Sequence, residues 1–262
     1  MKQERVAPLY RCDRDAVLLT QPDLFLVGDA FCAVVEEPRK FSLLEVLIVG
    51  HSKGDAHIAH SLGVIPAALV EILLKDFIHF LDKGRWYHTQ GVRYMSVALA
   101  MAHNEDLEKA ELAGLLHDCA KCIPDKKKIR LCEENNIPIT KVERGNPFLL
   151  HSKLGAYIAR EKYDIEDEEV LSAITWHTTG QPNMTKLEQI VFIADYIEPL
   201  RDKAPNLKPI REIAFRDLDE CCYMILRDML AYLRSGGGEI DEHSQAAYDY
   251  YNELHMSRNL NV

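Results

Sequence analysis

The chain has 262 residues, of which 47% are hydrophobic and 27% charged, an ordinary composition for a globular protein. A net charge of −10 argues against nonspecific nucleic-acid binding, which needs a basic surface. The apolar runs are shorter than the roughly 18 residues of a membrane span, and seven cysteines without disulfide-like spacing indicate a reducing compartment. We therefore expect a cytoplasmic protein that binds neither membrane nor nucleic acid. The sequence leaves the oligomeric state open, with a homodimer as one candidate.

The first 71 residues mix short apolar runs with turns. The runs 23–28 and 44–50 each end in glycine and predict short buried strands, while 30–36 and 64–73 are candidate helices. We expect residues 1–71 to form a short α/β segment that is distinct from residues 72–262.

The rest of the chain shows helical periodicity and no strand pattern. Apolar residues recur at spacings of three and four, as in Leu187, Ile190, Val191 and Ala194. The predicted helices cover 70–82, 86–102, 106–120, 125–135, 149–162, 167–177, 186–198, 208–232 and 242–256. The predicted fold class is therefore an all-α helical bundle with a short α/β N-terminal segment.

A set of histidines and aspartates stands out by context within these helices. Asp118 and Asp195 lie in or beside apolar helical runs, where a buried carboxylate needs a cation or a metal as partner. His117 precedes Asp118 by one helical step of about 100°, so both side chains can face one ion, and Lys121 shares their face. A single histidine is more often a surface or core residue, so the prediction depends on the whole set: His88, His117, Asp118, His151, His177 and Asp195.

Mixed imidazole and carboxylate ligands suit Fe, Mn or Zn better than a soft thiolate metal. Six such ligands can hold two ions if Asp118 bridges them. The nearby C-x-x-C of Cys119 and Cys122 lies at a helix end in an all-α region, where packing explains it better than redox chemistry or zinc binding.

The order His, His-Asp, His, His, Asp resembles the HD-domain superfamily of metal-dependent phosphohydrolases. The neighbouring motifs are similar to those of the bacterial YqeK-like family. They are RWYHTQGV at 85–92, GLLHDCAK at 114–121, Leu150-His151, HTTG at 177–180, and IADYIEP at 193–199 followed by Arg201.

This resemblance implies an enzyme that hydrolyses diadenosine tetraphosphate symmetrically into two ADP. It implies a site for two divalent metal ions, usually iron, with Mn, Co or Zn as alternatives, and the six residues named above as the ligands. Asp118, Lys121 and Arg201 are then the catalytic candidates, the latter two as cations that neutralise charge on the transferred phosphate. The candidate substrate contacts are Arg85, Lys121, Thr178, Thr179, Gly180 and Arg201.

Two other functions stay open on the sequence. An HD phosphohydrolase with the same ligands can act on a cyclic dinucleotide, a guanosine polyphosphate or a deoxynucleotide. The chain can also be a catalytically idle module that binds a nucleotide.

The N-terminal segment weakly resembles the later part of a nicotinate-nucleotide adenylyltransferase, over residues 22–30, 43–50 and 65–72. The glycine-rich opening of that enzyme, with its His-x-x-His pair, is missing, so we expect a degenerate remnant without adenylyltransferase activity. An unrelated extension is the alternative.

Overall fold

The computed structural model describes residues 25–27, 30–32, 70, 73 and 81–260. In the N-terminal part, β1 (Phe25–Val27) pairs antiparallel with β2 (Ala30–Cys32), and Phe25 lies opposite Cys32. Strand β1 falls within the predicted strand 23–28. Strand β2 replaces the start of the candidate helix 30–36, because hydrogen bonding to a neighbouring strand outweighs local helical preference. The predicted strand 44–50, most of the helices 64–73 and 70–82, and the boundary at 71 lie outside the described residues.

Residues 81–260 form a helical bundle, which confirms the predicted all-α class. Among the described residues, no helix combines the length and the apolar composition of a membrane span. The elements are α4 (Lys83–His103), α5 (Leu107–Leu116), α6 (Asp125–Glu134), α7 (Lys141–Gly145), the 3₁₀ helix η1 (Pro147–Leu150), α8 (His151–Tyr163), α9 (Glu168–Trp176), α10 (Lys186–Ile197), α11 (Leu207–Ala214), α12 (Leu218–Ser235) and α13 (Glu242–Asn259).

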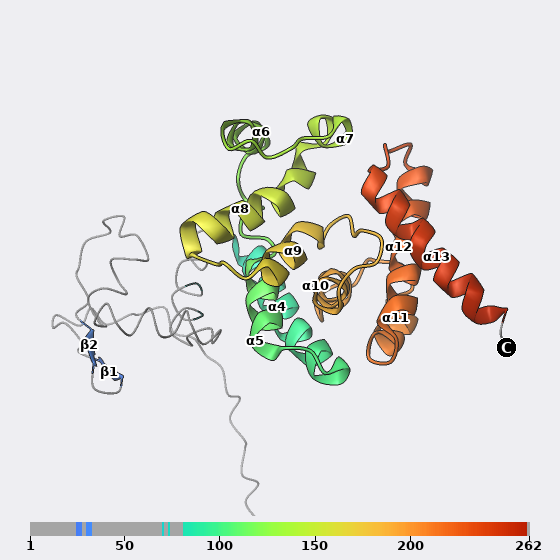
Figure 1. The fold of residues 1–262 in the computed structure, drawn as a ribbon, viewed down its shortest axis with the longest axis horizontal. Coiled ribbons are helices and arrows are strands. Elements are labelled where there is room, and N and C mark those ends of the chain that lie inside the picture. Colours follow the sequence, from blue (N-terminus) through green and yellow to red (C-terminus); the bar gives the residue numbers. More distant parts are fainter. Residues whose placement is uncertain (1–24, 28–29, 33–69, 71–72, 74–80, 261–262) are drawn as a thin grey trace, which may run out of the picture. The chain divides into compact units, whose positions relative to one another are not determined.

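Helix α10 is the core of this bundle. It packs against α4, α5, α9, α11 and α12, and Figure 1 shows it between α9 and α12. Every residue from Leu187 to Ala194 is buried, as expected for a helix that is covered on all sides. A capping box fixes its start, since Thr185 Oγ1 accepts from Glu188 N and the Glu188 carboxylate accepts from Thr185 N.

Helices α4 and α5 approach each other closely at Gly114. A Cβ atom at this position would lie 2.8 Å from Ser96 Oγ and 3.1 Å from the Arg93 Cα atom. The two helices therefore pack as an antiparallel pair, which brings the start of α4 beside the end of α5. His88 and His117 come from these two ends.

Two helix ends near these histidines differ from the prediction. Helix α4 begins at Lys83, where the Asp82 side chain accepts from Arg85 N at 2.9 Å, so His88 lies in the second turn rather than at the opening. Helix α5 ends at Leu116 instead of residue 120. Tight i to i−3 turns follow, such as Lys121 N to Asp118 O at 2.9 Å.

The predicted helix 208–232 is in fact two helices, α11 and α12. Asp217 between them has an extended backbone, with φ of −149°, and its side chain accepts from Glu220 N at 3.0 Å. An aspartate followed by acidic residues is a helix-start signal, and here it outweighs the continuous apolar periodicity. Helix α7 also forms where the prediction has none, behind a capping box of Thr140 and Glu143.

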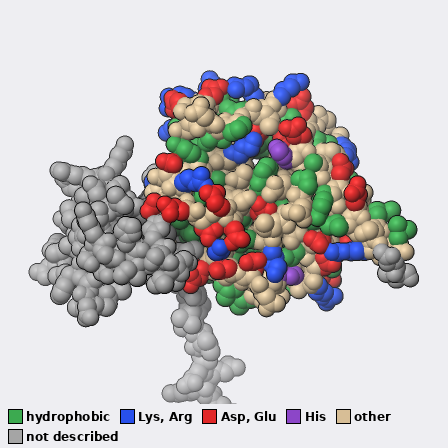
Figure 2. Space-filling view, in the orientation of Figure 1, with side chains coloured by type: hydrophobic (Ala, Val, Ile, Leu, Met, Phe, Trp, Pro, Cys, Tyr) green, Lys and Arg blue, Asp and Glu red, His purple; other side chains and the backbone are tan. Residues whose placement is uncertain are grey.

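The surface of this bundle carries both signs of charge. Figure 2 shows acidic side chains intermingled with lysines and arginines over one face. Such mixing is typical of a solvated surface.

Candidate metal centre

All six predicted ligands converge on one place in the bundle. His88 comes from α4, His117 and Asp118 from the turn after α5, His151 from the start of α8, His177 from the end of α9 and Asp195 from α10. All are buried except Asp195, whose side chain is 24% exposed. The site is thus assembled from helix ends and the last turns of a core helix.

Three of the histidines are oriented by the same kind of contact with the local backbone. In each, the Nδ1 atom faces the backbone carbonyl three residues earlier, and because a carbonyl only accepts, the proton lies on Nδ1. The Nε2 lone pair is then directed into the centre. The three contacts are His117 to Gly114 O at 2.7 Å, His151 to Phe148 O at 2.5 Å and His177 to Ile174 O at 2.7 Å.

The fourth histidine, His88, is held by a carboxylate instead. Its Nδ1 lies 3.1 Å from Glu198 Oε1, and Glu198 is only 2% exposed. Its Nε2 lies 3.0 Å from Asp195 Oδ1. A lone pair and a carboxylate oxygen this close repel each other unless a proton or a metal ion lies between them.

Asp118 lies among the imidazoles, with its two oxygens facing different rings. Oδ2 lies 3.5 Å from His117 Nε2 and 3.7 Å from His88 Nε2. Oδ1 lies 3.2 Å from His151 Nε2 and 3.7 Å from His177 Nε2. Although buried, Oδ1 has no hydrogen-bond donor among the described residues. An orphaned carboxylate oxygen that faces two nitrogen lone pairs fits a cation.

Two overlapping triplets have ligand atoms within 4.8 Å of one another. One is His88, His117 and Asp195, and the other is His117, Asp118 and His177. His117 belongs to both triplets and lies where the two halves of the site meet.

The protonation states favour ligation. Burial alone would raise the pKa of Asp118, but the neighbouring imidazoles of His117, His151 and His177 outweigh burial and hold that pKa well below its ordinary value. For Asp195, the contact with the His88 imidazole and the proximity of His117 and Arg201 likewise outweigh burial and lower the pKa. Burial lowers the pKa of His151 to about 4, so its ring is neutral at neutral pH.

Three cationic side chains surround these ligands. Arg85 Nη1 donates to Asp118 Oδ2 at 2.6 Å, and Arg201 Nη2 donates to Asp195 Oδ1 at 2.8 Å. Lys121 Nζ lies 3.1 Å from His151 Nε2 and 3.6 Å from Asp118 Oδ1. Burial lowers the pKa of Lys121, and the carboxylates of Asp118 and Asp195 oppose that shift. The predicted phosphate-binding cations thus lie beside the predicted ligands.

Only part of the Thr-Thr-Gly turn faces the centre. Thr178 Oγ1 lies 3.1 Å from His151 Nε2 and 3.0 Å from His177 Nε2. Thr179 donates its hydroxyl to Gly180 O at 3.1 Å, and Gly180 N donates to Trp176 O at 2.9 Å. The Thr178 hydroxyl therefore lies beside the imidazoles, whereas the Thr179 hydroxyl and the Gly180 N–H hydrogen-bond within the turn; all three stay predicted substrate contacts.

A cavity of about 560 Å³ opens beside the ligands. Its lining includes Arg85, His88, Asp195, Glu198 and Arg201. A volume of this size is within the range of small-molecule sites. A second cavity, of about 610 Å³, adjoins it and shares Arg201 and Asp202.

Comparison with known proteins identifies the family. Residues 85–200 match the HD domain family. The chain is 38% identical over 169 residues to the symmetrical bis(5'-nucleosyl)-tetraphosphatase of Halalkalibacterium halodurans, an alignment that covers 64% of this chain and 89% of the relative.

A solved structure and a longer relative agree with this match. The structure, from Clostridium acetobutylicum, is described as a predicted HD superfamily hydrolase involved in NAD metabolism. Its TM-score is 0.68 at 36% identity, covering 71% of this chain and 97% of the other. A Mycoplasma pneumoniae protein named as a probable nicotinate-nucleotide adenylyltransferase/Ap4A hydrolase is 32% identical over 192 residues, covering 68% of this chain and 53% of its own length. A relative that joins both activities fits the weak N-terminal resemblance.

An HD domain implies binding of a divalent metal, and the donor set described above fits one. The chain belongs to the HD-domain hydrolases of the YqeK-like family, whose relatives carry the name bis(5'-nucleosyl)-tetraphosphatase, symmetrical.

Proposed function

We propose that this protein hydrolyses diadenosine tetraphosphate symmetrically into two ADP at a centre of two divalent metal ions, iron by preference and Mn, Co or Zn as alternatives. His88, His117 and Asp195 would hold one ion, His151 and His177 the other, and Asp118 would bridge them. The names of the curated relatives support the substrate.

The observation that carries the two-ion proposal is that the two oxygens of the Asp118 carboxylate face different pairs of histidines. Its Oδ2 faces His88 and His117, while its Oδ1 faces His151 and His177. A carboxylate that offers one oxygen to each of two imidazole pairs is the arrangement that a bridging ligand requires.

The reaction joins a water oxygen to one of the two central phosphorus atoms and breaks the bond from that phosphorus to the oxygen that bridges the two central phosphorus atoms. That oxygen leaves on the second ADP, and the water gives up its proton to solvent. Each product then carries two phosphates. Bound divalent ions would lower the pKa of the attacking water and neutralise charge on the phosphoryl oxygens.

The chain's own residues bind and orient the polyphosphate. Arg85 and Arg201 line the cavity beside the ligands, and their guanidinium groups can pair with phosphate oxygens in a fixed geometry. Lys121 adds a compact positive charge next to His151. The Thr178 hydroxyl can hydrogen-bond to a phosphate oxygen or to the attacking water, because it lies between two imidazoles.

The test is product chromatography after incubation with diadenosine tetraphosphate and Fe(II) that is kept reduced. We expect ADP as the sole product, and no product from His117→Ala or Asp195→Asn. His103→Ala serves as the matched control, because His103 bonds to Ala214 O away from the ligands and should leave activity unchanged.

Other outcomes would overturn the proposal. ATP with AMP would mean that the water attacks a different phosphorus atom. An unchanged substrate with turnover of another nucleotide would move the assignment to that nucleotide. Tight ADP binding without turnover would identify a binding module.

A further inference from the structure

The last residue of α10 and the turn that follows it, residues 197–201, carry two side chains that reach the metal centre. Glu198 contacts His88 Nδ1, and Arg201 donates to Asp195 through both Nη2 at 2.8 Å and Nε, the latter to the backbone oxygen at 3.0 Å. Residues 198–201 form a turn rather than a helix, which is closed where Arg201 N donates to Glu198 O at 3.0 Å. Its position therefore decides where both side chains lie.

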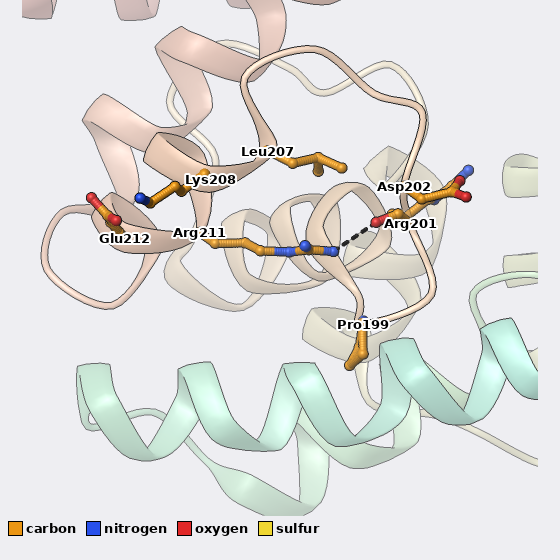
Figure 3. A pocket seen from close by; sticks show the side chains of 7 residues that line it. All are labelled: Pro199, Arg201, Asp202, Leu207, Lys208, Arg211 and Glu212. Carbon is orange, nitrogen blue, oxygen red and sulfur yellow. Dashed lines mark hydrogen bonds between the residues drawn. The ribbon is translucent and has the colours of Figure 1, made fainter.

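Arg211 of α11 holds this segment by its backbone. Its Nε donates to Ile197 O at 2.9 Å, and its Nη2 donates to Glu198 O and to Arg201 O, both at 2.8 Å. Figure 3 shows the guanidinium reaching across the second cavity to Arg201. A lysine cannot replace this contact, because a single ammonium lacks the planar fork that reaches three separate carbonyls.

The Glu198 carboxylate is fixed at both oxygens. Oε1 faces His88 Nδ1 at 3.1 Å, and Oε2 accepts from Leu200 N at 2.6 Å. Gly91 lies one turn after His88 on α4, and a Cβ atom there would be 2.6 Å from Oε2. The carboxylate thus fits against α4 only because Gly91 has no side chain.

We propose that Arg211 and Glu198 are positioning residues for the metal centre. Arg211 holds the 197–201 segment in place, and Glu198 thereby keeps the His88 proton on Nδ1 and its Nε2 lone pair available. The metal role of His88 rests on the proposed function, whereas the effect on its proton does not. A carboxylate partner of a ligating histidine sets its tautomer and orientation in this way.

The variants Arg211→Lys and Glu198→Gln test this proposal. A glutamine has one acceptor oxygen, so it can serve either His88 or Leu200 N but not both. Arg216→Lys is the matched control, because Arg216 is exposed just after α11 and undergoes the same chemical change. The readouts are the hydrogen bond from His88 Nδ1–H to Glu198, observed through the Nδ1–H signal in NMR of the ¹⁵N-labelled, metal-free full chain, and the affinity for Mn(II) alone.

We expect a hydrogen-bonded His88 Nδ1–H in the wild type, a weakened or lost hydrogen bond in both test variants, and a Mn(II) affinity that falls about 10- to 100-fold in them. The control should match the wild type. Either readout staying at its wild-type value in both variants overturns the proposal. If Arg211→Lys fails to fold, Glu198→Gln decides alone. A wild type that neither binds Mn(II) nor hydrolyses the dinucleotide contradicts the proposed function, and the comparison of the His88 Nδ1–H hydrogen bond still decides the positioning roles.

Discussion

His151 Nε2 lies 3.1 Å from His177 Nε2, although each ring already directs its Nδ1 to a backbone carbonyl. With their protons on Nδ1, the two rings present Nε2 lone pairs to each other and cannot share a hydrogen bond. The protein holds this arrangement in a buried place, because the carbonyls of Phe148 and Ile174 fix the rings. A cation between the rings relieves the repulsion.

Replacing His151 by alanine should therefore remove one of two ions. His88, His117 and Asp195 remain for the other ion, so the metal content should fall from about two to about one per chain. Loss of several kcal/mol of charge stabilisation predicts a fall in turnover of about a thousandfold. Elemental analysis and initial rates check this, with His103→Ala as control. A variant that keeps both ions would contradict the assignment of His151.

Asp118→Asn should lower the metal content more than His151→Ala does. An amide offers one acceptor oxygen and a donating NH₂ group, so it cannot give an oxygen to both halves of the site. We expect both ions to bind more weakly, by about 10- to 100-fold or more. Asp202→Asn, at an exposed residue that lines the cavity beside the ligands, should leave metal affinity unchanged. Loss of only one ion in Asp118→Asn would exclude the bridging role.

Lys121→Met should lower turnover strongly and leave the metal content nearly unchanged. The Lys121 ammonium lies beside Asp118 and His151 but is a cation, so it cannot ligate a metal while charged. If it stabilises charge on the transferred phosphate, its removal should cost about 10²- to 10³-fold in kcat. Lys126→Met, on the exposed face of α6, is the control. An unchanged kcat with a raised KM would limit Lys121 to substrate binding.

Gly91→Ala should destabilise the fold. The new methyl group would lie 2.6 Å from Glu198 Oε2, and relieving that overlap should lower the free energy of unfolding by about 1–3 kcal/mol. Gly155→Ala is a matched control in α8, because its Cβ would find its nearest neighbour at an ordinary 3.5 Å. We expect that change to be neutral or to stabilise by up to about 1 kcal/mol. Denaturant titrations of both variants measure these changes in the free energy of unfolding, and equal values for the two variants would contradict the prediction.

The two cysteines of the C-x-x-C, Cys119 and Cys122, should differ strongly in thiol reactivity. Burial raises the pKa of Cys119 to about 12, and its thiol donates to Gly155 O, whereas Cys122 is exposed. Alkylation at about pH 8 should label Cys122 at least about 100-fold faster than Cys119, as mass spectrometry can measure. Because the pKa of Cys119 is higher folded than unfolded, its contribution to stability is lost as pH rises from about 9 to about 12. Equal labelling would contradict the packing interpretation.

The sequence pointed to the residues that converge on the centre, but it did not point to the residues that hold them in position. Asp118 and Asp195 could be found because a carboxylate in an apolar helical run is costly, and that cost is visible in sequence. Glu198 lies in the IADYIEP motif, but nothing in its context points to His88, which is 110 positions away. Arg211 left no signal at all, because its three partners are backbone carbonyls, which every residue has.

The helix boundaries show a second limit of sequence reasoning. Periodicity alone joined α11 to α12, although Asp217 carries the helix-start signal. It also extended α5 through Asp118, where tight turns in fact form. Both errors have one cause: apolar spacing reports which residues are buried, and burial continues across a break in the helix.

The ligands span the chain from His88 to Asp195 and come from α4, α8 and α10 and from the ends of α5 and α9. Two ions held by these ligands and bridged by Asp118 would together crosslink five helices that are far apart in the sequence. The unfolded chain has no such cluster, so metal should load after the bundle assembles and then resist its opening. Removing the metal would then lower the stability of the whole bundle as well as stop hydrolysis.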